Sequence, residues 1–362
     1  MTTAADDTLL AALRARLGAD WVLTGADAAP FLTDQRRVLH GQALAVARPA
    51  DADGLAAVLR LCNAARVPVV PQGGNTGLMG GATPDSGGHS VVLSLGRLNR
   101  VLGIDTDNDT ITVQAGCVLA QVQEAASQAG RLFPLSLGSE GSCTIGGNLA
   151  TNAGGTQVLR YGNARELTLG LEVVTAEGEV WNGLRGLRKD NTGYSLRDLY
   201  IGSEGTLGVI TAATLKLYPK PAEQGSALAQ ARDGGNVKHD ISVPVSRIPA
   251  FLQGAAQALH ALDPGLRPMA FGHLGDGNLH YNVSHDPAGP VARLFANEAR
   301  IHDLVHAQAH AQGGSISAEH GIGQVKRDAL PHFKSPLELA LMRRVKQALD
   351  PLNLMNPGKV LS

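Results

Sequence analysis

The order of apolar and polar positions predicts short helices and strands that alternate up to about residue 218. Apolar residues at helical spacing predict helices over 8–17, 52–65 and 118–129. Alternating or short apolar runs predict strands over 67–70, 91–95, 110–116, 207–218 and, as a pair, within 167–181. Such a mixture of short strands, helices and tight turns is typical of an α+β domain.

The composition changes at 219–226, where proline, glycine and polar residues interrupt the pattern. Beyond this joint the sequence predicts a strand over 239–245, a helix over 246–262, a hairpin over 268–283, a long helix over 292–312 and a final helix from Ser335. We therefore expect a first domain over 1–219, a smaller second domain over 220–324 and a C-terminal segment over 325–362.

Charge and cysteine content exclude several classes of protein. The 362 residues carry a net charge of −1, which excludes a general basic surface for nucleic acid. Three cysteines without C-x-x-C spacing argue against a secreted disulfide framework. The N-terminus is acidic with no apolar run behind it, and no stretch approaches the ~18 apolar residues of a membrane span. We expect no nucleic-acid partner, no transmembrane segment and a reducing, cytoplasmic location.

The 44 glycines cluster in short runs, and the first informative run is PQGGNTGL at 71–78, directly after a predicted strand. Gly73, Gly74 and Gly77 allow successive backbone N–H groups to turn toward one point, which suits the oxygens of a diphosphate. An ordinary turn after a buried strand explains the same residues equally well. The chain contains neither G-x-G-x-x-G nor G-x-x-x-x-G-K-[ST], so Rossmann and Walker sites have no support.

Further glycine-rich segments include GSCTIGGNLATNAGG, LRYGN, LRKDNTGY and IGSEGTLGVIT. Together with PQGGNTGL they resemble the signatures of the FAD-linked D-2-hydroxyacid dehydrogenases, a group that includes D-lactate and D-2-hydroxyglutarate dehydrogenases and the flavin subunit of glycolate oxidase. The resemblance runs from about residue 30 to 220 and from about 236 to the end. It implies an α+β, two-domain FAD-binding fold of vanillyl-alcohol-oxidase (PCMH) type, with an antiparallel-sheet substrate domain and a C-terminal segment that returns to the FAD domain.

The resemblance also places the cofactor, with 71–78 at the FAD diphosphate and 138–155 and 201–210 along the flavin and its ribityl chain. Relatives that attach the flavin covalently usually carry a histidine in the first loop, where this chain has Asn75. We therefore expect FAD bound without a covalent link. The implied FAD-binding residues are Pro71, Gln72, Gly73, Gly74, Asn75, Thr76, Gly77, Leu78, Gly138, Ser139, Gly141, Ser142, Thr144, Ile145, Gly146, Gly147, Asn148, Thr151, Asn152, Gly154, Gly155, Glu204, Gly205, Gly208, Val209, Ile210 and Asn356.

The second domain contains FGHLGDGNLHYN at 271–282, with the hairpin signal Asp-Gly at its centre. A two-residue turn at that dipeptide sets His273 opposite His280, at the roughly 4.5–5.5 Å Cβ separation that suits two imidazoles on one divalent ion. Asn278 and Asn282 share that face, and a solvated polar face is the plain alternative. The opposite face, which we expect in the core, carries Leu274, Leu279, Tyr281 and Val283.

The segment SISAEHGIG at 315–323 supplies the carboxylate of Glu319, which completes a His₂Glu metal set, and beside it His320, a candidate proton acceptor. A surface loop explains this pair equally well from the residues alone. The resemblance makes His273, His280 and Glu319 ligands of one divalent metal, with zinc favoured, and makes His320 the catalytic base.

The joint between 219 and 236 is the main departure from the family pattern. Relatives normally have a much longer stretch here, with an arginine that binds the substrate carboxylate, and only 227–232 resembles its last residues. The resemblance makes Lys238 the cation that meets the substrate carboxylate, with Asn282 assisting. We expect an intact FAD domain, an intact metal site and a shortened substrate domain.

A second candidate metal site is formed by His302, His306 and His310, which lie one helical turn apart in the helix predicted over 292–312. No acidic or sulfur-bearing residue joins them at that spacing. We therefore expect a solvent-facing stripe and leave these histidines out of the site.

Our first hypothesis is an FAD-dependent dehydrogenase that oxidises a D-2-hydroxy acid to a 2-oxo acid. In it the metal lowers the pKa of the substrate hydroxyl, His320 takes the proton, and the hydride passes to flavin N5. No nicotinamide motif is present, so the electrons leave to a quinone, an electron-transfer flavoprotein or a cytochrome. A non-catalytic flavin-binding subunit is the second hypothesis, because the substrate domain is short. A metallohydrolase leaves the glycine-rich loops unexplained, and the sequence leaves a homodimer open.

Overall fold

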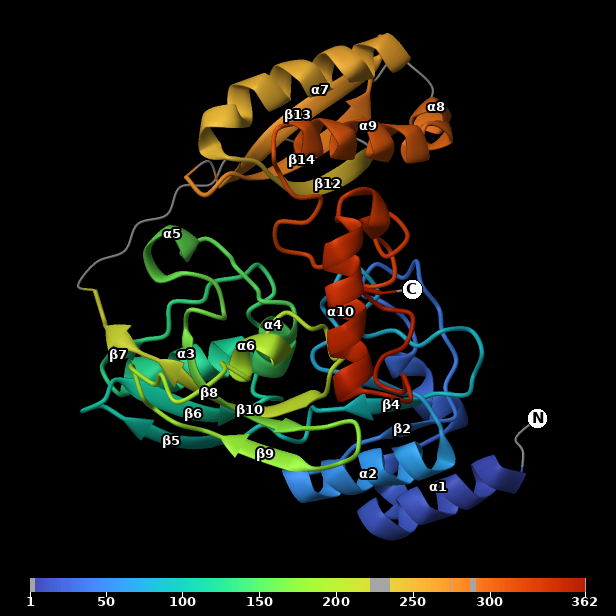
Figure 1. Cartoon of the computed structure of the whole chain (residues 1–362), viewed down its shortest axis with the longest axis vertical. Coiled ribbons are helices and arrows are strands. Elements are labelled where there is room, and N and C mark those ends of the chain that lie inside the picture. The colour runs from blue at the N-terminus through green and yellow to red at the C-terminus, as the bar shows by residue number, and fades with distance from the viewer. Residues whose placement is uncertain (1–3, 222–234, 274, 287–290, 362) are drawn as a thin grey trace. The chain divides into compact units, whose positions relative to one another are not determined.

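The computed structural model of the protein describes residues 4–221, 235–273, 275–286 and 291–361. The chain forms two compact units, unit 1 made of Met1–Pro221 together with Gly321–Ser362 and unit 2 made of Ala222–His320 (Figure 1). The expected joint lies largely outside the described residues, as do the 227–232 segment and Leu274. Within the described residues no helix has the length and apolarity that a membrane span requires.

Unit 1 contains a four-stranded sheet in the order β1-β2-β4-β3, in which β4 lies parallel to both β2 and β3. This part of the unit consists of α1 (Ala4–Leu17), η1 (Ala19–Trp21), β1 (Val22–Leu23), η2 (Gly25–Phe31), β2 (Ala45–Ala47), α2 (Ala52–Ala65), β3 (Val69–Gln72) and β4 (Val91–Ser94). Helix α2 has the predicted bounds, and its N-cap Asp51 accepts a hydrogen bond from the N–H of Gly54 at 2.7 Å. Its apolar face packs into the same core as β4, so the helix fixes the sheet from which the 71–78 loop leaves.

The rest of unit 1 is built on a five-stranded antiparallel sheet in the order β5-β6-β10-β8-β9. Its elements are β5 (Val101–Asp105), β6 (Thr110–Gln114), α3 (Leu119–Gln128), β7 (Arg131–Leu132), α4 (Ile145–Ala150), α5 (Val158–Tyr161), β8 (Thr168–Val174), β9 (Val180–Gly183), α6 (Arg197–Tyr200), β10 (Val209–Lys216), β11 (Tyr218–Pro219), η4 (Leu330–His332) and α10 (Pro336–Leu349). Strand β10 is buried along almost its whole length and begins directly after the glycine-rich 201–208 segment. The predicted start of the last helix is confirmed, because Ser335 and Glu338 form a capping box at α10.

Unit 2 is a three-stranded antiparallel sheet in the order β12-β14-β13, with helices packed on one face (Figure 1). Its elements are β12 (Asn236–Ser242), η3 (Val245–Arg247), α7 (Ile248–Leu262), β13 (Leu266–His273), β14 (Asn278–His285), α8 (Val291–Ala296) and α9 (Glu298–Ala311). Leu279, Tyr281 and Val283 of β14 are buried in one core with α7 and α9, as the alternation predicted. The opposite face of the sheet is therefore left to the polar side chains.

The long helix predicted over 292–312 is two helices, because the chain leaves helical geometry at Asn297, whose side-chain amide donates to the Arg293 carbonyl at 3.1 Å. The expected solvent-facing stripe is wrong for His306, which is only 8% exposed. His306 follows Val305 of the buried stripe on α9, so it lies at the edge of the core, where its ring centroid is 5.7 Å from that of His239 on β12. His310 is exposed, as expected.

Candidate active site

Two glycine-rich segments of unit 1 lie directly against each other. A Cβ atom on Gly73 would come within 2.4 Å of the Thr144 hydroxyl, and one on Gly74 within 2.1 Å of the Ser142 carbonyl oxygen. Neither position therefore accepts a side chain, whereas a Cβ on Gly77 would meet nothing within 4 Å. The loop after β3 and the segment that leads into α4 thus pack backbone to backbone and leave open space at Gly77.

Five buried polar atoms of unit 1 have no hydrogen-bond partner among the described residues: Arg48 Nε, Ser90 Oγ, Thr144 Oγ1, Asn148 Nδ2 and Asn356 Oδ1. The last three belong to residues that the sequence placed at the FAD, whereas Arg48 and Ser90 were not expected there. A buried donor or acceptor left unpaired costs about 1–3 kcal/mol, so such atoms in native proteins usually meet a ligand or an ordered water. A polar, extended cofactor needs both hydrogen-bond donors and acceptors in its site. The unpaired atoms of Thr144, Asn148 and Asn356 offer both, so these residues fit such a cofactor.

Several other residues expected at the FAD use their side chains to hold the loops. Gln72 is buried and donates to the carbonyls of Phe31 and Ala82, each at 2.9 Å. Asn75, in the left-handed conformation at φ 51°, donates through its amide to the carbonyl of Thr33 at 2.8 Å. These side chains shape the loop from within, which leaves its backbone N–H groups to meet a ligand.

Glu204 joins the C-terminal part of unit 1 to the 201–208 segment. Its carboxylate accepts hydrogen bonds from the N–H groups of Ile322 and Gly323, both at 2.8 Å. Burial raises the pKa of Glu204, and these two hydrogen bonds together with nearby Lys326 oppose that shift. Asn356 donates to the backbone carbonyl oxygen of Glu204 at 2.8 Å. The side-chain carboxylate and the backbone carbonyl of Glu204 therefore both bind the C-terminal segment.

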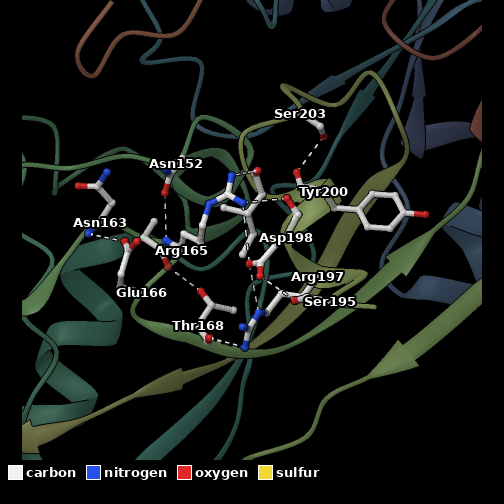
Figure 2. Close-up of polar contacts among 12 residues, drawn as sticks. Asn152, Asn163, Arg165, Glu166, Thr168, Ser195, Arg197, Asp198, Tyr200 and Ser203 are labelled. Carbon is white, nitrogen blue, oxygen red and sulfur yellow. Dashed lines mark hydrogen bonds and ion pairs between the residues drawn. The ribbon is translucent and has the colours of Figure 1, made fainter. Parts of the chain in front are cut away.

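Arg165 connects two of the proposed FAD segments through hydrogen bonds (Figure 2). Its backbone N–H donates to the side chain of Asn152 at 3.0 Å, while its guanidinium donates to the carbonyls of Asp198 and Ile201 at 2.9 and 2.6 Å. A planar guanidinium with several donors suits this bridging position. These hydrogen bonds fix the position of the segment around Asn152 relative to the segment around Ile201.

The register predicted for the β13–β14 hairpin is wrong by two residues. His273 pairs with Asn278, and His280 pairs with Phe271. The connection is longer than the expected two-residue turn because Asp276 donates its N–H to the His273 carbonyl at 3.2 Å and accepts the Asn278 N–H at 3.0 Å. A shift of two residues keeps every side chain on its face, so His273 and His280 remain on one face as diagonal neighbours, with ring centroids 6.2 Å apart.

Strand β12 adds its own polar residues to this face of the sheet. Lys238 pairs with Asn282, and Asp240 pairs with His280. The structure therefore brings together the two residues expected to bind substrate, Lys238 and Asn282, on neighbouring strands. Both amide atoms of Asn278 are buried on this face without a hydrogen-bond partner among the described residues.

The loop that follows α9 brings Glu319 and His320 to the same sheet. Glu319 Oε1 lies 3.9 Å from His273 Nδ1, and the rings of His280 and His320 are 6.2 Å apart between centroids. His273 Nδ1 is buried and has no hydrogen bond within the described residues. The donor chemistry is that of a His₂Glu set, but the described part of the chain contains no group of three or more His, Cys, Asp or Glu side chains already arranged to hold a metal ion.

The sequence did not single out Asp240, which is 3% exposed. Its Oδ2 atom accepts the backbone N–H groups of Ala318, Glu319 and His320, at 3.1, 2.9 and 2.9 Å. An aspartate near the end of a strand is too common a pattern to indicate such a role from the sequence. No spacing in the sequence connects it to a loop almost 80 residues away.

Two protein families together match most of the chain. Residues 43–183 match the FAD binding domain family, and residues 216–360 match the C-terminal domain of the FAD linked oxidases. The two matches fall on the parts expected to bind FAD and substrate.

Curated relatives share about a third of their residues with this chain. A D-2-hydroxyglutarate dehydrogenase of Xanthomonas citri pv. viticola is 35% identical, with 88% of this chain and 89% of that protein covered. The mitochondrial D-2-hydroxyglutarate dehydrogenase of Bos taurus is 34% identical, covering 92% and 79%. That of Stutzerimonas stutzeri is 30% identical, and the alignment covers 99% of both proteins.

The alignment with the Stutzerimonas stutzeri protein also reveals a difference in length. It runs over 463 positions, 101 more than the 362 residues of this chain. At least 101 positions of that relative therefore have no counterpart here, and they lie inside the aligned region. The expected shortened substrate domain predicts an internal shortfall of this kind.

Two solved structures share the fold at low sequence identity. An alkyldihydroxyacetonephosphate synthase has a TM-score of 0.73 at 15% identity, covering 97% of this chain and 84% of that one. A p-cresol methylhydroxylase has a TM-score of 0.63 at 13% identity, covering 99% and 97%. The expected α+β FAD-binding fold class is therefore confirmed.

Proposed function

The chain belongs to the family of FAD-linked D-2-hydroxyacid dehydrogenases, and from that premise we propose that it oxidises D-2-hydroxyglutarate or a close D-2-hydroxy acid to the 2-oxo acid. The observation that carries the proposal is the set of unpaired buried atoms on Thr144, Asn148 and Asn356. Thr144 and Asn148 come from one segment and Asn356 from the C-terminal part of unit 1, and each carries one polar atom that a bound FAD would satisfy. Bound FAD supplies the acceptor for the substrate hydride.

In unit 2 we propose that Lys238 binds the substrate carboxylate, because its side chain is exposed and it pairs with Asn282 on the neighbouring strand. His320 takes the proton of the substrate hydroxyl. His273, His280 and Glu319 would hold one divalent ion, with zinc favoured, which would polarise that hydroxyl. Support for this last assignment comes from the buried His273 Nδ1, which lies 3.9 Å from Glu319 Oε1 and has no hydrogen bond within the described part of the chain.

The test is anaerobic reduction of the bound flavin. D-2-Hydroxyglutarate is expected to bleach the yellow protein, with the L enantiomer as the matched control. D-Lactate and other D-2-hydroxy acids then rank the substrates. The missing positions favour one alternative, a flavin-binding protein that no longer turns over. A protein that binds FAD but is bleached by none of these acids would support that alternative.

We propose a quinone, an electron-transfer flavoprotein or a cytochrome as the electron acceptor. Reoxidation of the substrate-reduced protein by each class, followed from the return of the flavin absorbance, identifies it. Reoxidation by NAD⁺ would contradict this proposal.

Acid precipitation is expected to release the flavin into the supernatant. The loop in which covalent relatives usually carry a histidine has Asn75 here, whose amide donates a hydrogen bond to the Thr33 carbonyl and is not nucleophilic. The flavin absorbance of the supernatant and of the pellet after centrifugation shows whether the flavin is covalently bound. Yellow colour retained in the washed pellet would contradict non-covalent binding.

Substitution His280→Ala is expected to reduce the metal content from about one ion per chain to nearly none, because two remaining ligands bind a divalent ion weakly. Elemental analysis of the purified protein measures this. His310→Ala is the matched control, since His310 is exposed on α9, and it should keep the metal. Metal retained in His280→Ala but lost in His306→Ala would move the site to the histidines of α9.

A further inference from the structure

Asp240 holds the loop that carries two of the proposed active-site residues. Three consecutive backbone N–H groups, those of Ala318, Glu319 and His320, converge on its Oδ2 atom. Consecutive amides that point at one oxygen form a nest, an arrangement that favours an anion. Hydrogen bonds to an ionised acceptor are about twice as strong as neutral ones.

A second contact fixes the start of the same loop. Ser242 and Ser315 exchange both backbone hydrogen bonds, at 3.1 and 2.8 Å. The loop therefore leaves α9, pairs with the end of β12 at Ser242, and runs back beside that strand to Asp240. Two anchor points, two residues apart on one strand, determine where the following side chains lie.

The anchored loop directs its two polar side chains to different neighbours. Glu319 lies beside His273 of β13, and His320 lies beside His280 of β14. The His320 Nδ1 atom is 3.6 Å from Asp240 Oδ2, which is too long for a hydrogen bond. The same oxygen also accepts the Ser317 hydroxyl at 3.5 Å and lies within ion-pair distance of the His320 ring, so Asp240 contacts this loop through the three backbone amides and through these two side chains.

We propose that Asp240 is a positioning residue of the hydroxy-acid site, whose carboxylate holds 318–320 so that Glu319 and His320 face the sheet. This inference rests on the roles proposed above for those two residues. The alternative is that Asp240 only stabilises the fold of unit 2. The two roles make different predictions for an Asp240 variant. A positioning role predicts slower flavin reduction in the molecules that remain folded, whereas a purely structural role predicts fewer folded molecules with an unchanged rate.

The informative variant is Asp240→Asn, which keeps the size of the side chain but removes its charge. Loss of such an outer support is expected to slow flavin reduction roughly 10–100-fold at saturating substrate, with little change in the substrate concentration at half-saturation. The rate constant is measured in single-turnover, anaerobic stopped-flow experiments, so a smaller folded fraction lowers the amplitude but not the rate. Asp240→Glu restores the charge and should recover part of the rate.

Asp263 provides the matched control. It also accepts a backbone N–H, from Gly265 at 2.8 Å, and it also lies near a histidine, with Asp263 Oδ2 3.5 Å from His285 Nε2. It is at the opposite end of the hairpin from His273, because β13 and β14 pair Leu266 with His285 there. Asp263→Asn should leave the rate constant unchanged.

A second readout does not depend on activity. Hydrogen exchange of the peptide that contains 318–320 should accelerate in Asp240→Asn and stay at the parent rate in Asp263→Asn, because the three amides lose their charged acceptor. Unchanged exchange would overturn the proposal whatever the activity. Faster exchange with a parent rate of flavin reduction would overturn the positioning role. A parent protein that no hydroxy acid reduces would instead defeat the proposed function, and exchange alone would then decide whether Asp240 holds the loop.

A double-mutant cycle gives the sharpest result. If Asp240 acts through the loop that carries His320, then Asp240→Asn should slow the His320→Asn protein much less than it slows the parent. Equal factors in both backgrounds would mean that the two residues act independently, and would contradict the proposal.

Discussion

Replacing His320 with asparagine is expected to slow flavin reduction by a D-2-hydroxy acid about 10²–10⁴-fold, the usual contribution of a general base. The side chain of His320 is 29% exposed, so a substrate can reach the imidazole. Its ring lies beside that of His280, with an interplanar angle of 23°. Asparagine preserves the size and much of the hydrogen bonding, but it has no basic nitrogen to take the hydroxyl proton.

The measurement is the first-order rate of flavin bleaching in anaerobic stopped flow, with FAD and metal content determined on the same samples. His310→Asn serves as the matched control and should react at the parent rate. Loss of metal in His320→Asn would make His320 a ligand rather than a base. A parent rate in that variant would mean that the proton leaves by another route, and the mechanism would be wrong at its central step.

The sequence predicted which residues share a face of the unit 2 sheet but not which residues pair. Strand periodicity assigns His273 and His280 to one face under any register shift of an even number of residues. The exact register depends on the turn, where Asp276 favours a longer connection by accepting the Asn278 N–H. The alternation of apolar residues does not indicate whether the turn has two residues or more.

The sequence did not predict contacts between segments that lie far apart in the chain. The packing of Gly73 against Thr144 and the hold of Asp240 on 318–320 both join loops far apart in the chain. By contrast, helix α2 was predicted with its observed bounds, because its N-cap and its apolar face are local features. The burial of His306 was missed because it depends on how closely α9 packs on β12, with His239 beneath it.

The second large effect concerns stability, and it arises where the C-terminal segment of unit 1 meets the 201–208 segment. Lys346 of α10 donates to the carbonyls of Thr206 and Met355, at 2.7 and 2.8 Å, and also pairs with the carboxylate of Asp350. Asp350, 1% exposed, in turn accepts the N–H groups of Leu354 and Met355, at 3.0 and 2.9 Å. This pair, with Asp350 buried and Lys346 half-buried, shapes the turn that precedes Asn356.

Lys346→Met is therefore expected to lower the free energy of unfolding by about 3–5 kcal/mol, because it leaves the carboxylate of Asp350 buried without its cation. Urea unfolding of the FAD-loaded protein, followed by circular dichroism and by release of flavin fluorescence, measures the loss. Directly before α10, Lys334 pairs with Glu338 at the surface, at 3.0 Å, and Lys334→Met should cost much less stability, because solvent screens an exposed pair.

Adding Asp350→Asn to Lys346→Met removes the unpaired charge, so the double variant should lose less stability than the sum of the two single variants. The isolated carboxylate, rather than the loss of an attractive contact, would then account for most of the effect. Strict additivity, or a loss in Lys346→Met no larger than in Lys334→Met, would show that water reaches Asp350 and that the pair does not fix the turn before Asn356.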